Sequence, residues 1–233
     1  MNTTSDLSFE GLKQKQRDIR AAFPEDLGLR VHRAISWLHR AEMAGDDHDA
    51  AFIFYWIAFN AAYANELKDS DLEGERSVFA DYFARLTGLD RNNRIYDVIW
   101  ERFPQEIRLL LQNRYVFQPF WRYQNGQLGG EQWETSFDRS QRRVARALKE
   151  QDTKTILSTL FDRLYVLRNQ LVHGGATWNS QVNRDQVRDG ASVLGVLLPS
   201  FLLAGRQEPK HVQFGKRFPQ GKWKEGPKGF RGG

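Results

Sequence analysis

The spacing of apolar positions predicts helices along most of the chain. Val31, Ile35 and Leu38 recur at three- and four-residue intervals, as on one face of a helix. Alternating β-branched residues, which are typical of strands, are scarce, and YQNGQLGGEQ at 123–132 has the composition of a loop. We therefore expect an all-α fold, with helices at about residues 8–22, 28–44, 48–68, 76–87, 92–101, 104–113, 131–150, 153–173 and 181–204.

The segment AAFIFYWIAFNAAYA, within the predicted helix 48–68, is apolar around most of the helix circumference. A bilayer-spanning helix needs about 20 apolar residues. This run is shorter and contains Asn60, which favours a central helix of a bundle over a membrane segment. A buried amide must be hydrogen-bonded or it costs about 1–3 kcal/mol. Two roles for Asn60 stay open: a structural hydrogen bond inside the bundle, or substrate binding in a cleft.

Charge separates the end of the chain from the rest. Residues 204–233 carry eight lysines and arginines against two glutamates, a net charge of +6, so the net charge of +5 leaves residues 1–203 at −1. We predict a helical domain at 1–204 and a disordered tail at 205–233, rich in glycine. Cations such as Lys216 and Arg217, with rings such as Trp223, suit single-stranded nucleic acid of any sequence. A solubilising or partner-docking tail is the alternative.

Composition narrows the chemistry further. Cysteine is absent, which excludes disulfides, thiolate metal sites and cysteine nucleophiles. His32 and His39 have the spacing of one helix face but lack a third ligand nearby, so no metal site is expected. The N-terminal residues lack the apolar core of a secretory signal. These features favour a cytoplasmic protein.

The segment LYVLRNQLVHGGATW, residues 164–178, places polar groups on an apolar helix. A helical wheel gathers the leucines into one stripe about 60° wide, while Asn169 and His173 lie nearly opposite and Arg168 lies on a flank. The two glycines after His173 are expected to unwind the helix and free its imidazole. The face opposite the leucines therefore needs a second packing partner, either another helix or another subunit. The stripe consists of Leu160, Leu164, Leu167 and Leu171.

These polar side chains suffice for one kind of chemistry. Histidine transfers protons near neutral pH, and arginine stabilises the charge that develops on a transferring phosphoryl group. Asn169 can orient either partner. The 2′-hydroxyl of RNA can itself attack the adjacent phosphate, so neither a metal nor a protein nucleophile is required. The alternative is structural, because arginine and histidine in a last helical turn are common caps. Trp178 follows the segment and is a candidate to cover the cleft and bind substrate.

RNQLVHG, residues 168–174, resembles the Arg-polar-x-x-x-His motif of HEPN domains, the higher eukaryotes and prokaryotes nucleotide-binding family. As in that family, the motif lies near the end of a late helix of an all-helical chain. YWIAFNAAYA, residues 55–64, is similar to the second helix of some bacterial members. The resemblance covers about residues 28–67 and 150–204, and leaves a helical insertion at about 70–150 and the tail outside it.

The resemblance implies an antiparallel helical bundle that forms a homodimer through its motif helices, with one composite cleft. It assigns proton transfer to His173, phosphate binding to Arg168 and orientation of both to Asn169, without a cofactor. HEPN ribonucleases act in toxin–antitoxin, abortive-infection and CRISPR defence systems, so an antitoxin or regulatory protein is an expected partner besides RNA. Some members are non-catalytic, and an RNA- or protein-binding module is the alternative.

Overall fold

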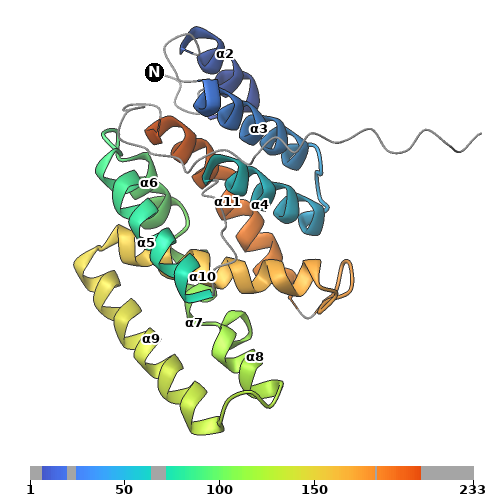
Figure 1. Ribbon diagram of the computed structural model, residues 1–233, viewed down its shortest axis with the longest axis vertical. Helices are drawn as coiled ribbons and strands as arrows, with labels where there is room; N and C mark the ends of the chain where they lie inside the picture. The colour runs from blue at the N-terminus through green and yellow to red at the C-terminus, as the bar shows by residue number, and fades with distance from the viewer. Residues whose placement is uncertain (1–6, 20–24, 64–71, 182, 206–233) are drawn as a thin grey trace, which may run out of the picture.

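The computed structural model describes residues 7–19, 25–63, 72–181 and 183–205, all of which lie in helices or their connections (Figure 1). No strand occurs within these ranges, so the predicted all-α class is confirmed. The elements are α2 (Phe9–Ile19), α3 (Glu25–Glu42), α4 (His48–Tyr63), α5 (Leu72–Gly88), α6 (Arg94–Asp97), the π-helical η2 (Val98–Arg102), α7 (Pro104–Gln112), the 3-10 turn η3 (Arg114–Val116), α8 (Gln118–Gln124), α9 (Gly130–Glu150), α10 (Thr153–Val172) and α11 (Arg184–Gly205).

Helix α10 lies in the middle of the molecule, with α3 and α4 above it and α8 and α9 below it in Figure 1. The ring of Phe161 in α10 is fully buried. Its centroid lies 4.5 Å from that of Phe59 in α4 and 4.7 Å from that of Phe83 in α5. Phe201 of α11 packs against Phe161 at 5.9 Å. Aromatic rings from four helices therefore form the centre of the core.

The expected insertion, at about residues 70–150, consists of two parts. Its first part belongs to the main core, where Phe83, Ile99 and Leu110 are buried. Its second part has a small core of its own, in which Phe117 and Phe120 pack with Trp133 of α9. Helices α5 to α7 therefore belong to the main bundle, whereas α8 and the first part of α9 form a smaller unit below α10, and Val144 and Ala147 of α9 return to the main core (Figure 1).

The helix expected at about 92–101 is present at 94–102, but two local details of this region were not predicted. The single helix expected at 92–101 is a four-residue α-helix followed by the π-helical segment η2. The carboxylate of Asp90 starts α6 by accepting backbone N–H groups of Arg94 and Ile95, at 2.9 and 2.8 Å. Helix α8 was not expected; it begins with Pro119 in its first turn, where a missing N–H costs nothing.

The leucine stripe of α10 faces the core as predicted. Leu160, Leu164 and Leu167 are fully buried, and Leu171 is half-buried at the edge. Gly190 of α11 crosses this stripe closely: a Cβ there would lie 2.9 Å from the ring of Phe52 and 3.1 Å from Leu164. Only glycine allows α11 to approach α4 and α10 at this point.

Helix α11 is the one helix among the described residues that is long and apolar enough to cross a membrane by length and composition. Of its most apolar window, 72% is buried inside the protein. Pro199, where the sequence predicts a kink, lies within the helix and is buried. Burial on this scale is typical of a core helix in a bundle.

Asp152 starts α10, because its Oδ1 accepts the backbone N–H of Thr155 at 3.0 Å. Burial alone would raise the pKa of this carboxyl, but hydrogen bonds from Thr155 and two nearby positive charges bring the pKa below its ordinary value. We expect Asp152→Ala to lower the free energy of unfolding by about 1 kcal/mol at neutral pH, which is typical of a lost N-cap.

Because the pKa is lower in the folded protein, this stabilisation is present above the unfolded-state pKa and is lost as the pH falls through the folded-state value. Urea unfolding at several pH values should therefore show wild type and Asp152→Ala converging in acid. Asp152→Asn is the matched control, because it retains a capping oxygen without the charge. If the difference in free energy of unfolding between wild type and Asp152→Ala stays constant in acid, the charge of Asp152 does not contribute to the cap.

Candidate functional site

The motif residues lie together at the C-terminal end of α10. Arg168 Nη1 donates a hydrogen bond to Asn169 Oδ1 at 2.8 Å, and both side chains are half-buried. His173 is the C-cap and is exposed, with its backbone N–H bonded to the carbonyl of Asn169 at 3.0 Å. Gly174 has φ +72°, so the chain leaves the helix as the paired glycines predicted. The imidazole is therefore presented to solvent, five residues beyond the arginine whose guanidinium Asn169 holds.

Gln170 fixes this helix end to two distant segments. Its Nε2 donates to the carbonyl of Tyr115 in η3 at 2.7 Å, and its Oε1 accepts from Asn183 Nδ2 at 2.9 Å. The sequence did not single out Gln170, because an amide inside a motif has no periodicity that marks its contacts. Gln170 is thus a positioning residue between the motif helix, the insertion and the start of α11.

The loop that follows the motif is held against the start of α4. The carboxylate of Asp49 accepts from Arg184 Nη1 at 2.9 Å and from the backbone N–H of Asn179 at 3.1 Å. Arg184 Nη1 also donates to Asn179 Oδ1 at 2.7 Å. This ion pair is largely buried, with 21% and 13% of the two side chains exposed, so its charges are less screened than those of a surface pair. The loop is therefore anchored at both of its ends.

Apolar side chains stay uncovered beside the histidine. Trp178 is 74% exposed, and its indole N–H donates to Asp47 at 3.3 Å. Val172, the residue before His173, is 48% exposed. On the same helix Tyr165 packs against Trp56 of α4, at a centroid distance of 6.2 Å. Within the described ranges of the chain, the earlier part of the second face of α10 thus has a packing partner, whereas Val172 and His173 at its end are exposed.

Asn60 is not the buried amide that the sequence suggested, because its side chain is exposed. On a helical wheel it falls about 40° beyond Trp56, just outside the buried arc of α4. It also lies about 16 Å along α4 from Asp49, which holds the motif loop. Its predicted substrate-binding role thus has no contact with the motif to support it. The other predicted substrate-binding residues, Lys216, Arg217 and Trp223, lie outside the described residues.

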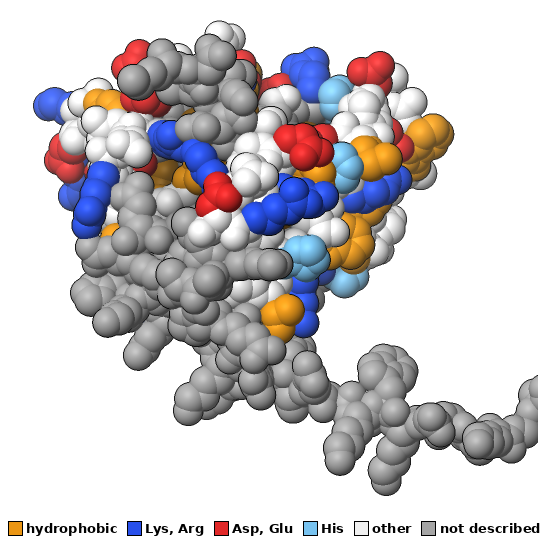
Figure 2. All heavy atoms as spheres, turned by 90° about the horizontal axis from the view of Figure 1, so that it is seen from above, with side chains coloured by type: hydrophobic (Ala, Val, Ile, Leu, Met, Phe, Trp, Pro, Cys, Tyr) orange, Lys and Arg blue, Asp and Glu red, His pale blue; other side chains and the backbone are white. Residues whose placement is uncertain are grey.

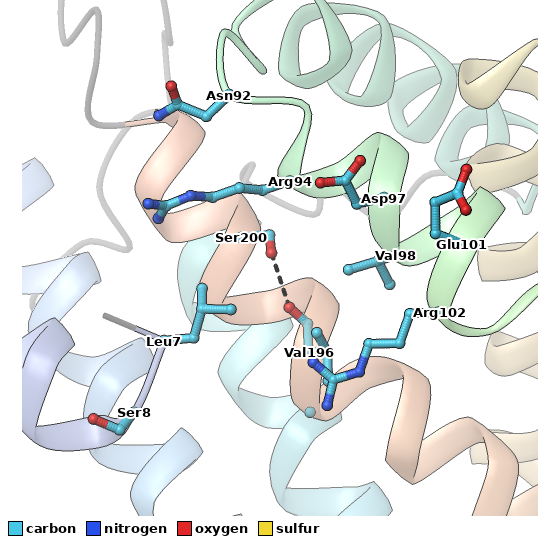
Figure 3. Close-up of a pocket in the computed structure, with 11 residues that line it drawn as sticks. Leu7, Ser8, Asn92, Arg94, Asp97, Val98, Glu101, Arg102, Val196 and Ser200 are labelled. Carbon is cyan, nitrogen blue, oxygen red and sulfur yellow. Dashed lines mark hydrogen bonds between the residues drawn. The ribbon is translucent and has the colours of Figure 1, made fainter. Parts of the chain in front are cut away.

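A cavity of about 780 Å³ lies elsewhere, between the start of α2, the α6–η2 segment and α11. Figure 3 shows Arg94 and Arg102 entering it from α6 and η2, with Ser200 of α11 bonded to the carbonyl of Val196 at 3.0 Å. None of its lining residues belongs to the motif, and Asp97 and Glu101 line it together with the two arginines. This mixture of charges makes the cavity a poor site for an RNA backbone.

The described side chains on the face above α2 and α3 form no patch of a single charge (Figure 2). Seen from above α2 and α3, basic, acidic, histidine and hydrophobic side chains alternate (Figure 2). Among the residues that the structure describes, no group of three or more histidine, aspartate or glutamate side chains is placed to hold a metal ion.

Comparisons with protein-family models, with curated proteins and with solved structures give no match to this chain.

Proposed function

We propose that the protein is a metal-independent endoribonuclease of HEPN type, active as a homodimer. The observation that carries this proposal is the end of α10, where Asn169 holds the half-buried guanidinium of Arg168 and His173 is presented to solvent. Histidine, arginine and an orienting amide suffice for RNA cleavage by its own 2′-hydroxyl. By the same resemblance, we place the activity in a toxin–antitoxin or phage-defence system of the cytoplasm, with an antitoxin or regulatory protein as partner.

In the proposed reaction, an imidazole accepts the proton of the 2′-hydroxyl as that oxygen attacks the adjacent phosphorus. The bond from phosphorus to the 5′-oxygen breaks, and a second imidazole, in its protonated form, donates a proton to the leaving oxygen. Arg168 stabilises the negative charge on the phosphoryl oxygens during this exchange. The products are a 2′,3′-cyclic phosphate and a 5′-hydroxyl, and no water or metal is consumed.

Two protons move in this reaction, and one chain carries one histidine in the motif. Arg168 and His173 are also five residues apart, about 140° around the helix, so one copy does not aim both side chains in the same direction. Two copies related by a twofold axis would supply two imidazoles and two guanidiniums to one cleft. The uncovered Val172 and Trp178 beside His173 offer apolar surface for this pairing.

Incubation of the purified protein with RNA in the presence of EDTA tests the proposal. We expect cleavage that persists in the chelator and leaves 2′,3′-cyclic phosphate ends, detected by mass spectrometry of the fragments. Cleavage that requires magnesium would point to a carboxylate site instead. RNA that is bound but never cleaved would favour the non-catalytic HEPN-like binding module.

A further inference from the structure

Three aromatic side chains form an exposed edge on the insertion, below the end of α10. Tyr115 is 45% exposed, Trp121 is 36% exposed and Tyr123 is 40% exposed. Arg114 and Arg122, which are also exposed, lie next to them in the chain. We call these five residues the aromatic edge. A group of exposed rings on one surface is a candidate site for a ligand or partner, whereas single exposed rings are common.

The rings of the aromatic edge are held in place by a buried layer behind them. Phe120 lies between Tyr115 and Trp121, with centroid distances of 5.4 and 5.5 Å, and packs on Trp133 at 5.2 Å. Tyr123 stacks on the other side of Trp133, at 6.0 Å. A flat ligand would therefore meet rings that are already ordered, which reduces the entropy lost on binding.

One arginine of the edge is ordered as well. Arg114 Nη2 donates to the hydroxyl of Tyr115 at 3.0 Å, and its guanidinium lies 5.0 Å from the centroid of that ring. Between Glu106 and Glu131 the chain contains three arginines and no aspartate or glutamate. The edge itself therefore combines three rings with two arginines and contains no carboxylate, which suits a ligand with planar groups and a negative backbone.

A single carbonyl joins the aromatic edge to the motif helix. The oxygen of Tyr115 accepts both the indole N–H of Trp121 and the amide of Gln170, each at 2.7 Å. These two nitrogens are thus at most 5.4 Å apart, which is twice 2.7 Å. Gln170 follows Asn169 directly and is three residues before His173. The carbonyl of Tyr115 therefore places the aromatic edge against the last turn of α10, next to the motif residues in the chain.

We infer that the aromatic edge binds single-stranded RNA next to the site of cleavage. Bases stack on Trp121 and Tyr123, and Arg114 and Arg122 contact the phosphates. This inference rests on the proposed function and assigns the insertion a role in holding the substrate. A duplex keeps its bases paired and stacked, so the edge selects unpaired RNA.

The test measures binding separately from cleavage. A fluorescein-labelled oligouridylate of about a dozen nucleotides is titrated with the His173→Ala protein, and Trp121→Ala is added on that background. Fluorescence anisotropy should show a roughly tenfold higher Kd, near the lower end of what one base stack contributes. Binding of a duplex RNA of the same length should not change.

Trp37→Ala is the matched control. Trp37 is 37% exposed, almost the same as Trp121, and stacks on Phe54 at 5.8 Å, but it lies on α3. We expect it to leave the Kd unchanged. Trp121→Phe keeps a ring but loses the indole hydrogen bond, so it should retain most of the affinity. If Trp121→Ala does not fold, Tyr123→Ala takes its place.

The salt dependence of RNA binding distinguishes the contribution of the arginines from that of the rings. Arg122→Ala should lower the slope of log K against log salt by about 0.7, the loss of one phosphate contact with a single strand, whereas Trp121→Ala should leave that slope unchanged. An unchanged Kd in both Trp121→Ala and Tyr123→Ala would overturn the inference. So would dissociation of a dimer by Trp121→Ala in sedimentation analysis, because the edge would then be a protein interface.

The failure of this inference differs from the failure of the proposed function. RNA that binds through Trp121 but is never cut would remove the ribonuclease proposal and leave the aromatic edge. If cleavage depends on His173 but the Kd for RNA does not change in Trp121→Ala, the ribonuclease proposal stands and the role of the aromatic edge is rejected.

Discussion

Replacing His173 with alanine is expected to abolish RNA cleavage and to leave the fold intact. General acid–base catalysis contributes about 10²- to 10⁴-fold to a rate, and the proposed cleft contains two copies of this imidazole. The side chain is exposed, and within the described residues no hydrogen bond or ion pair holds it. Its loss should therefore change the free energy of unfolding by less than about 0.5 kcal/mol. The measurement is the initial rate of RNA cleavage in EDTA, together with the thermal unfolding midpoint of the same sample.

His32→Ala is the matched control for this experiment, because His32 is also exposed but lies on α3. It should cleave RNA at the rate of the wild type. If His173→Ala instead lowers the unfolding midpoint and has no effect on cleavage, the residue is a helix cap and the catalytic role is wrong. Full cleavage by a stable His173→Ala protein would also reject that role.

The helices that were predictable from sequence are those that bury a single apolar face against the main core. The stripe of α10 and the positions of α3, α9 and α11 follow from a 3.6-residue period that packing then satisfies. Helix α8 has no such period: seven residues with a proline become a helix because Phe120 is buried against Trp133 of a later helix. Asn60 was placed wrongly for a related reason, since apolar neighbours in sequence do not say which arc of α4 is covered.

The site was predictable only where its residues are close in sequence. Arg168, Asn169 and His173 share one helix end and could be found from their spacing. The contacts that hold that end are long-range: 55 residues separate Gln170 from Tyr115, and 135 separate Arg184 from Asp49. No local pattern marks such pairs, because each member has the composition of an ordinary loop or helix end. The residues of the aromatic edge are close in sequence, but the contacts that order them and join them to α10 come from Trp133 and Gln170, which are distant in the chain.

Replacing Phe161 with alanine is expected to cause a large loss of stability, because this ring lies at the centre of the core. Removal of a fully buried phenylalanine costs about 3–5 kcal/mol, from lost burial and from the cavity that remains. The neighbouring rings come from three other helices, so no single element can shift to fill the space. For a chain of this length, such a loss lowers the unfolding midpoint by about 10 °C or more.

Phe54→Ala is the control, since Phe54 is half-buried on α4 and should cost about 1 kcal/mol or less. Phe161 is seven residues before Arg168 on the same helix, so Phe161→Ala also tests whether stability and chemistry can be separated on α10. Well below its unfolding midpoint, the variant should cleave RNA at the wild-type rate per folded molecule, whereas His173→Ala should not cleave at any temperature. A Phe161→Ala protein with an unchanged midpoint would contradict the central place of this ring. One that is folded but inactive in the cold would show that the geometry of the motif depends on the core two turns away.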